Sequence, residues 1–138
     1  MKLNSKPATK ASILFSVIGT AIVFIVIGIG FLPPNVTVND DLIRIRGLYG
    51  TSVSSSDVKG IYLIESNMRE IGYGRRSNGL SSGNIKKGHF SDKLLFIQDN
   101  TSRPTIHIER ANDKDIYISL SDGEKTRVLY DELSAAVR

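Results

Sequence analysis

The apolar residues of the chain are concentrated in one long stretch close to its start. No charged residue occurs from residue 11 to residue 39, and residues 13–32 are almost wholly apolar. A helix of about 20 residues spans about 30 Å, which is the thickness of a bilayer core. Pro33 and Pro34 would end the helix where the apolar run ends. The pattern therefore predicts a transmembrane helix over residues 13–32.

A cleaved signal peptide is the alternative for this stretch, because it also begins with basic residues. Its apolar core has about 7–15 residues and is followed by a small-x-small cleavage site. Here the apolar core is longer, and its exit, Gly30-Phe31-Leu32-Pro33-Pro34, lacks that pattern. We therefore favour an uncleaved span.

The charges on the two flanks predict the orientation of the span. Basic residues near a span stay on the cytoplasmic side, and acidic residues count for little. Lys2, Lys6 and Lys10 precede the span, whereas Arg44 and Arg46 are the first basic residues after it. This balance predicts a single-pass protein of the cell membrane, with a cytoplasmic N-terminus and an extracytoplasmic C-terminal domain.

After the apolar stretch, short runs of alternating apolar and polar residues follow one another. Such alternation is typical of half-buried strands, because successive side chains point to opposite faces. In residues 71–90, dense glycines predict turns, bulges and bent strands. No alternation of strands with helices is present, so a parallel sheet is not expected. The clearest strand patterns are residues 43–46, 51–54, 58–64, 94–97, 105–109 and 116–120.

The end of the chain predicts an amphipathic helix that covers the strands. Ser121-Asp122-Gly123-Glu124 fits a capping box, in which a serine is followed three residues later by an acidic residue. Apolar side chains then recur at helical spacing. We therefore expect four segments: a basic tail (1–12), the transmembrane helix (13–32), a linker (33–40) and a β-rich domain with a C-terminal helix (41–138).

Several short segments of this last part match a known family. They are Tyr49-Gly50, Arg76-Ser77-Asn78-Gly79, Gly88-His89-Phe90, Leu95-Phe96-Ile97 and Leu129-Tyr130-Asp131-Glu132-Leu133. Through these segments, residues 48–133 resemble the small bacterial pleckstrin-homology-like domains, which often occur next to transmembrane helices. The resemblance implies about seven antiparallel strands in a bent sheet or barrel with a C-terminal α-helix. It implies a binding module, but not phosphoinositide binding, because the loop at residues 47–50 has no basic residue.

Composition excludes several kinds of chemistry. The chain has no cysteine, so it forms neither disulfides nor thiolate zinc sites. His89 and His107 lie too far apart in sequence to predict a metal site. No Gly-x-Ser-x-Gly motif occurs, and no residue stands out as catalytic. We expect no enzyme activity, no metal and no cofactor.

Charge adds one candidate site. Three of the four net positive charges come from lysines of the basic tail, so a nucleic-acid partner is not expected. The remaining bias lies in the glycine-rich region, where Arg75, Arg76, Lys86 and Lys87 are candidate ligands for an anion. Arginines bind phosphate or carboxylate well, and glycine-rich backbone offers its own amides. The alternative is a basic, solvated loop without a ligand.

Two functions are compatible with these patterns. The first is a membrane-anchored pleckstrin-homology-like binding module that docks a partner protein or an envelope ligand at the membrane surface, through an exposed strand edge and the basic loops. The second is a non-catalytic accessory subunit of a larger membrane complex, in which residues 13–32 lie in the lipid bilayer and make the main contact.

Overall fold

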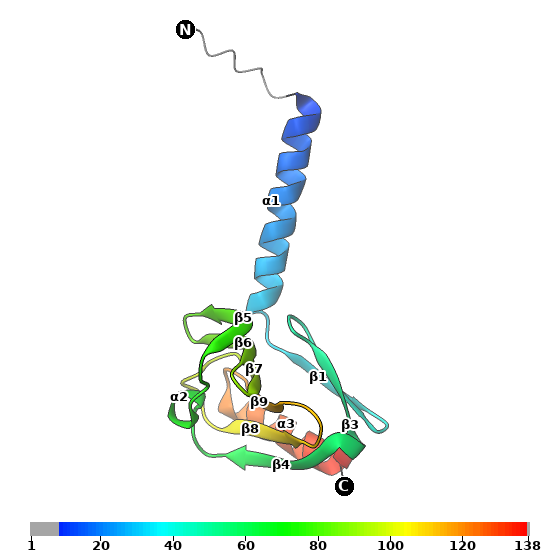
Figure 1. The fold of residues 1–138 in the computed structure, drawn as a ribbon, viewed down its shortest axis with the longest axis vertical. Helices are drawn as coiled ribbons and strands as arrows, with labels where there is room; N and C mark the ends of the chain where they lie inside the picture. The colour runs from blue at the N-terminus through cyan, green and yellow to red at the C-terminus, as the bar shows by residue number, and fades with distance from the viewer. Residues whose placement is uncertain (1–8, 138) are drawn as a thin grey trace.

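The computed structural model describes residues 9–137, apart from the side chains of residues 26, 27 and 29. The predicted tail residues Lys2 and Lys6 lie outside this part of the chain. The described part is mainly β, with three α-helices, one 3-10 helix and nine strands in two sheets (Figure 1). In chain order the elements are α1 (Lys10–Phe31), β1 (Asn35–Asn39), β2 (Leu42–Arg46), β3 (Thr51–Ser54), the 3-10 helix η1 (Ser55–Asp57), β4 (Val58–Ile64), α2 (Met68–Ile71), β5 (Arg76–Ser82), β6 (Ile85–Phe90), β7 (Lys93–Ile97), β8 (Thr105–Arg110), β9 (Asp115–Ser119) and α3 (Gly123–Val137).

The order of the strands corrects the predicted fold class. A small antiparallel sheet has the order β1-β2-β3, and a large sheet has the order β4-β8-β9-β7-β6-β5. In the large sheet β7 and β9 are parallel, because the β8–β9 hairpin places β9 between β8 and β7. The expected set of about seven antiparallel strands in one bent sheet or barrel, as in pleckstrin-homology-like domains, is therefore wrong.

The segment expected as a linker is part of the small sheet. Val36 and Val38 alternate with polar residues and pair with Ile45 and Ile43 of β2. Both valines pack against the main core. Alternation over only five residues also fits a polar connection, so the pattern of β1 does not by itself predict a strand. The linker predicted at residues 33–40 is accordingly too long, since β1 occupies most of it.

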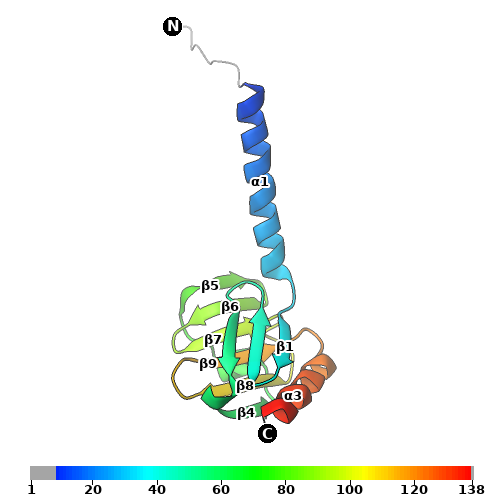
Figure 2. The same cartoon turned by 90° about the vertical axis from the view of Figure 1, so that its right-hand side faces the viewer.

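The main core lies between the two sheets and α3 (Figure 2). The small sheet contributes Ile43, Ile45 and Val53, and α3 contributes Leu129 and Leu133. Helix α3 contacts both β1 and β4, so it closes the gap between the edges of the two sheets. The large sheet supplies Leu94, Phe96, Ile106, Ile108, Ile116 and Ile118.

The predicted C-terminal helix is present as α3, but its cap differs from the expected one. The Oδ1 atom of Asp122 accepts a hydrogen bond of 2.9 Å from the backbone N–H of Glu124. The carbonyl of Asp122 also accepts the N–H of Thr126. Aspartate caps a helix start as well as serine does. Asp122 therefore takes the role that the sequence assigned to Ser121.

An ion pair joins α3 to the end of β4 and predicts a pH-dependent stability difference. Arg127 donates to both carboxylate oxygens of Glu65, at 2.7 and 2.8 Å, and this lowers the pKa of Glu65. A lowered folded pKa stabilises the protein above the usual value of about 4.5, and that stabilisation is lost as the pH falls through the folded value. Arg127→Met should therefore slightly lower the free energy of unfolding at neutral pH.

The difference between the original chain and Arg127→Met should disappear as the pH falls from neutral through the lowered folded pKa of Glu65, because its carboxylate is then protonated. Urea unfolding of both chains across this range measures it. Lys125→Met is the matched control, because it removes an exposed charge from the same helix. A difference that persists in acid would show that Arg127 acts through packing and not through the Glu65 carboxylate.

Helix α1 extends away from the β domain (Figures 1 and 2). In the described part of the chain, no helix is long and apolar enough to cross a membrane. The transmembrane helix at residues 13–32 is therefore not supported, and neither are the bilayer contact, the single-pass membrane localisation and the orientation predicted from it.

Candidate functional site

The C-terminal end of α1 is fixed to the β domain. The amide of Gln98 donates a hydrogen bond of 2.8 Å to the carbonyl of Phe31, and Lys87 Nζ donates to the carbonyl of Leu32. Gly30 is buried against the side chains of Leu48 and Leu80. The last carbonyls of a helix lack partners within it and carry partial negative charge, so an ammonium group there is favourable. These contacts hold the C-terminal end of α1, called its foot below, against β6 and the end of β7.

A cleft of about 210 Å³ lies beside this joint. Its wall is mainly apolar, and its polar residues are Asn35, Arg46 and Lys87. The Lys87 side chain is only 2% exposed, and burial lowers its pKa. Neither Lys87 nor Arg46 forms an ion pair with any carboxylate of residues 9–137. The apolar lining residues are Leu32, Pro33, Pro34, Leu48 and Phe96.

The structure separates the four basic residues that the sequence grouped together. Lys86 and Lys87 are neighbours on β6, so their side chains point to opposite faces of the large sheet. Lys86 is buried, donates to Ser81 Oγ at 2.6 Å and to the carbonyl of Gly83 at 3.0 Å, and lies over the ring of Tyr73. The two lysines therefore occupy separate positions on opposite faces of the sheet and do not form a shared anion site.

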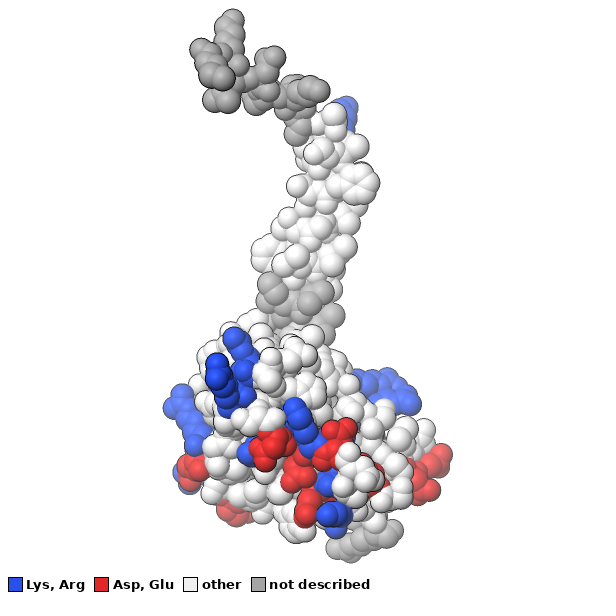
Figure 3. Space-filling view, viewed as in Figure 1, with Lys and Arg blue, Asp and Glu red and all other residues white. Residues whose placement is uncertain are grey.

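Arg75 and Arg76 lie at the start of β5, whereas Lys87 lies further along the β5–β6 pair. Arg76 pairs with Phe90, whereas Lys87 pairs with Leu80. Both arginines are exposed, and neither forms an ion pair within residues 9–137. Figure 3 shows lysine and arginine side chains on the side of the domain where β5 lies. Of the four candidates, these two are the exposed ones, whereas Lys86 and Lys87 are buried.

Strand β5 is an end strand of the large sheet and is paired only with β6. Residues 76–78 are exposed, and a bulge lies between Arg76 and Asn78. The other end strand, β4, packs beside α3. In the small sheet, β1 also contacts α3, and β3 has only four residues. Among the end strands in the described part of the chain, β5 thus offers the longest edge that is not packed beside α3, and the end of α1 reaches it where Gly30 lies against Leu80.

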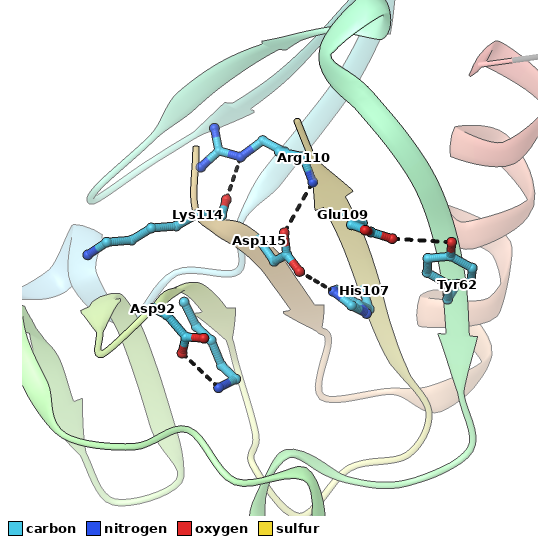
Figure 4. A network of polar contacts seen from close by, with 8 residues as sticks. Tyr62, Asp92, His107, Glu109, Arg110, Lys114 and Asp115 are labelled. Atoms are coloured by element: carbon cyan, nitrogen blue, oxygen red, sulfur yellow. Dashed lines mark hydrogen bonds and ion pairs between the residues drawn. The ribbon is translucent and has the colours of Figure 1, made fainter. Parts of the chain in front are cut away.

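Figure 4 shows a network of polar side chains on the face of the large sheet that points away from the main core. The sequence patterns did not predict this network. His107 Nε2 lies 2.8 Å from Asp115 Oδ2, and the Asp115 Oδ1 atom accepts the backbone N–H of Arg110. The Tyr62 hydroxyl donates to Glu109 at 3.3 Å. The position of His107 diagonal to Asp115 across the β8–β9 hairpin brings the two side chains together.

The network joins β4, β8 and β9 through side-chain hydrogen bonds. The ring of His107 stacks on that of Tyr117 at 4.5 Å, and burial with the nearby charges of Asp115 and Asp92 raises the pKa of Tyr117. His107 also lies beside the ring of Tyr62, so its imidazole contacts one carboxylate and two aromatic rings. Within residues 9–137, no group of three or more metal-binding side chains is found. We interpret the network as a set of polar contacts that stabilise the β8–β9 hairpin.

Comparison with known proteins adds no relative. No family model matches the chain, and no curated protein or solved structure is similar enough to match it. The resemblance to pleckstrin-homology-like domains is not tested by these comparisons.

Proposed function

We propose that this chain is a non-catalytic binding module that takes an extended, acidic segment of a partner protein along β5. The observation that carries the proposal is the edge of β5, a seven-residue strand hydrogen-bonded on one side only, with two exposed arginines at its start. Added strands gain affinity from backbone hydrogen bonds and specificity from side-chain contacts.

The arginines and the bulge determine which segments can pair with β5. Edge strands usually carry charges or bulges that discourage unselective pairing. Arg75 and Arg76 repel basic strands and form paired hydrogen bonds with carboxylates. The bulge after Arg76 bends the strand, so a partner strand should pair best along residues 78–82 and place its acidic residues beside the arginines.

A peptide as long as β5, with alternating glutamate and valine, is a direct probe. Arg75→Glu combined with Arg76→Glu should weaken its binding by roughly tenfold or more, because two attractive contacts become repulsive. Fluorescence anisotropy of the labelled peptide measures affinity, and amide chemical shifts identify the strand that is contacted. The expected shifts lie in β5.

Lys59→Glu combined with Lys125→Glu is the matched control, because it changes the net charge equally at exposed positions away from β5. A peptide with lysine in place of glutamate should bind weakly to the original chain. An equal loss of affinity in the control variant, or shifts confined to other strands, would contradict the proposal.

A specific observation also supports a second function, that of a subunit that docks through α1. Phe15 and Phe24 are 76% and 69% exposed, and the described surface of α1 visible in Figure 3 carries almost no charge. Large exposed apolar surfaces mark interaction sites. Phe15→Gln with Phe24→Gln should then dissociate the chain from a larger assembly, as seen by its mass in light scattering, while peptide binding at β5 stays unchanged.

A further inference from the structure

We infer that the cleft at the foot of α1 binds the head of an anionic amphiphile, a carboxylate or phosphate carried on an alkyl chain. This site is independent of the β5 edge. It is formed by residues from the end of α1, the start of β1, the end of β2, β6 and β7.

Lys87 supplies the first part of the argument. An ammonium group has three N–H donors, and within residues 9–137 the side chain of Lys87 has one acceptor, the carbonyl of Leu32. A buried charge is normally paired or hydrogen-bonded throughout, since its removal from water is costly. Lys87 is nevertheless 2% exposed and has no carboxylate partner in the described part of the chain. An anion in the cleft would supply the missing partner.

Arg46 supplies a second cation from a different strand. It lines the same cleft from the end of β2, is exposed, and forms no ion pair within residues 9–137. A guanidinium group binds carboxylate or phosphate through two parallel hydrogen bonds. Lys87 and Arg46 therefore place one buried and one accessible positive charge around a single cleft.

The rest of the lining selects an amphiphile over a small inorganic anion. Leu32, Pro33 and Phe96 offer no polar side-chain atom, and such a surface favours alkyl groups over hydrated ions. A volume of about 210 Å³ equals that of roughly seven water molecules, enough for an acidic head group and a few methylenes. The remaining alkyl chain can continue over Phe31 and Leu32, which are 42% and 58% exposed.

Isothermal titration calorimetry of the full chain with decanoate tests the inference, and decyl phosphate compares the two head groups. Decanol, acetate and inorganic phosphate separate the apolar from the charged contribution. Decanoate or decyl phosphate should bind roughly tenfold or more tightly than decanol, acetate and inorganic phosphate. Equal binding of decanol would show apolar adsorption only, and equal binding of inorganic phosphate would show a simple anion site. Either result would overturn the inference.

Two variants locate the binding. Lys87→Met and Arg46→Gln should each weaken decanoate binding by roughly tenfold and leave decanol binding unchanged. The side chains that hydrogen-bond to the end of α1 are Lys87 and Gln98, and not Arg46. Arg46→Gln therefore remains informative if Lys87→Met loosens the helix. Arg44→Gln is the matched control, since Arg44 is an exposed arginine of the same strand outside this cleft. Unchanged decanoate affinity in Arg46→Gln would refute the assignment.

Discussion

Replacing Ile118 with alanine should lower the free energy of unfolding by about 2–5 kcal/mol. Ile118 is 0% exposed in β9, and its register partners on the two sides are Phe96 and Ile106. Its side chain belongs to the core between the two sheets and α3. Neighbouring strands on both sides prevent the backbone from closing the cavity, so the cost should lie in the upper part of that range. Urea unfolding followed by circular dichroism measures the change.

Val128→Ala is the matched control for this substitution, because Val128 is 57% exposed on α3. It should change the free energy of unfolding by no more than about 0.5 kcal/mol. A loss below about 1 kcal/mol for Ile118→Ala would contradict the packing of β9 between β7 and β8. The pair of variants therefore tests whether Ile118 is packed in the core, and not merely the presence of β structure.

The strand order of the large sheet is the feature that could not be predicted from the sequence. The alternation of apolar and polar residues placed β3 and β4 at their observed bounds and came close for β2, β7, β8 and β9. Periodicity shows which face of a strand is buried, but it contains no information about its neighbours. The parallel pairing of β7 with β9 depends on where the β8–β9 hairpin inserts. No local residue pattern encodes that choice.

The glycine-rich region shows a second limit. Dense glycines correctly predicted bends and a bulge, but β5 and β6 carry too few apolar residues to show alternation. Their pairing is set by the turn at residues 83–84 and by close contact of the two backbones at Gly79 and Gly88. Short side chains permit this approach, and they are also the reason that the hydrophobic pattern disappears.

The candidate sites also differ in how far they could be predicted from the sequence. Arg75 and Arg76 were predicted from local charge and are free at the β5 edge. Lys86 and Lys87 were grouped with them, although the two-residue period of a strand sends adjacent side chains to opposite faces. The cleft beside Lys87 needs Leu32 and Arg46, which come from distant segments. Local charge can therefore point to exposed side chains such as Arg75 and Arg76, whereas a cleft such as the one beside Lys87 depends on tertiary structure.

Replacing Gly88 with alanine should cost about 2–4 kcal/mol of the free energy of unfolding, because two penalties combine. Gly88 has a φ of +99°, and an added Cβ would lie 2.7 Å from the carbonyl oxygen of Asn78 and 2.8 Å from the Cα of Gly79. Both contacts are with backbone of the paired strand, so relief requires β5 and β6 to separate. Urea unfolding measures the loss.

Gly83→Ala isolates the conformational penalty from the packing penalty. Gly83 has a φ of +56° in the turn between β5 and β6, and an added Cβ there meets no atom within 4 Å. It should cost about 1–2 kcal/mol, and Gly83→Asn should cost less because asparagine tolerates the left-handed conformation. If Gly88→Ala cost no more than Gly83→Ala, β5 would not be held tightly against β6. Its outer edge would then be too mobile to serve as the template on which the proposed partner strand assembles.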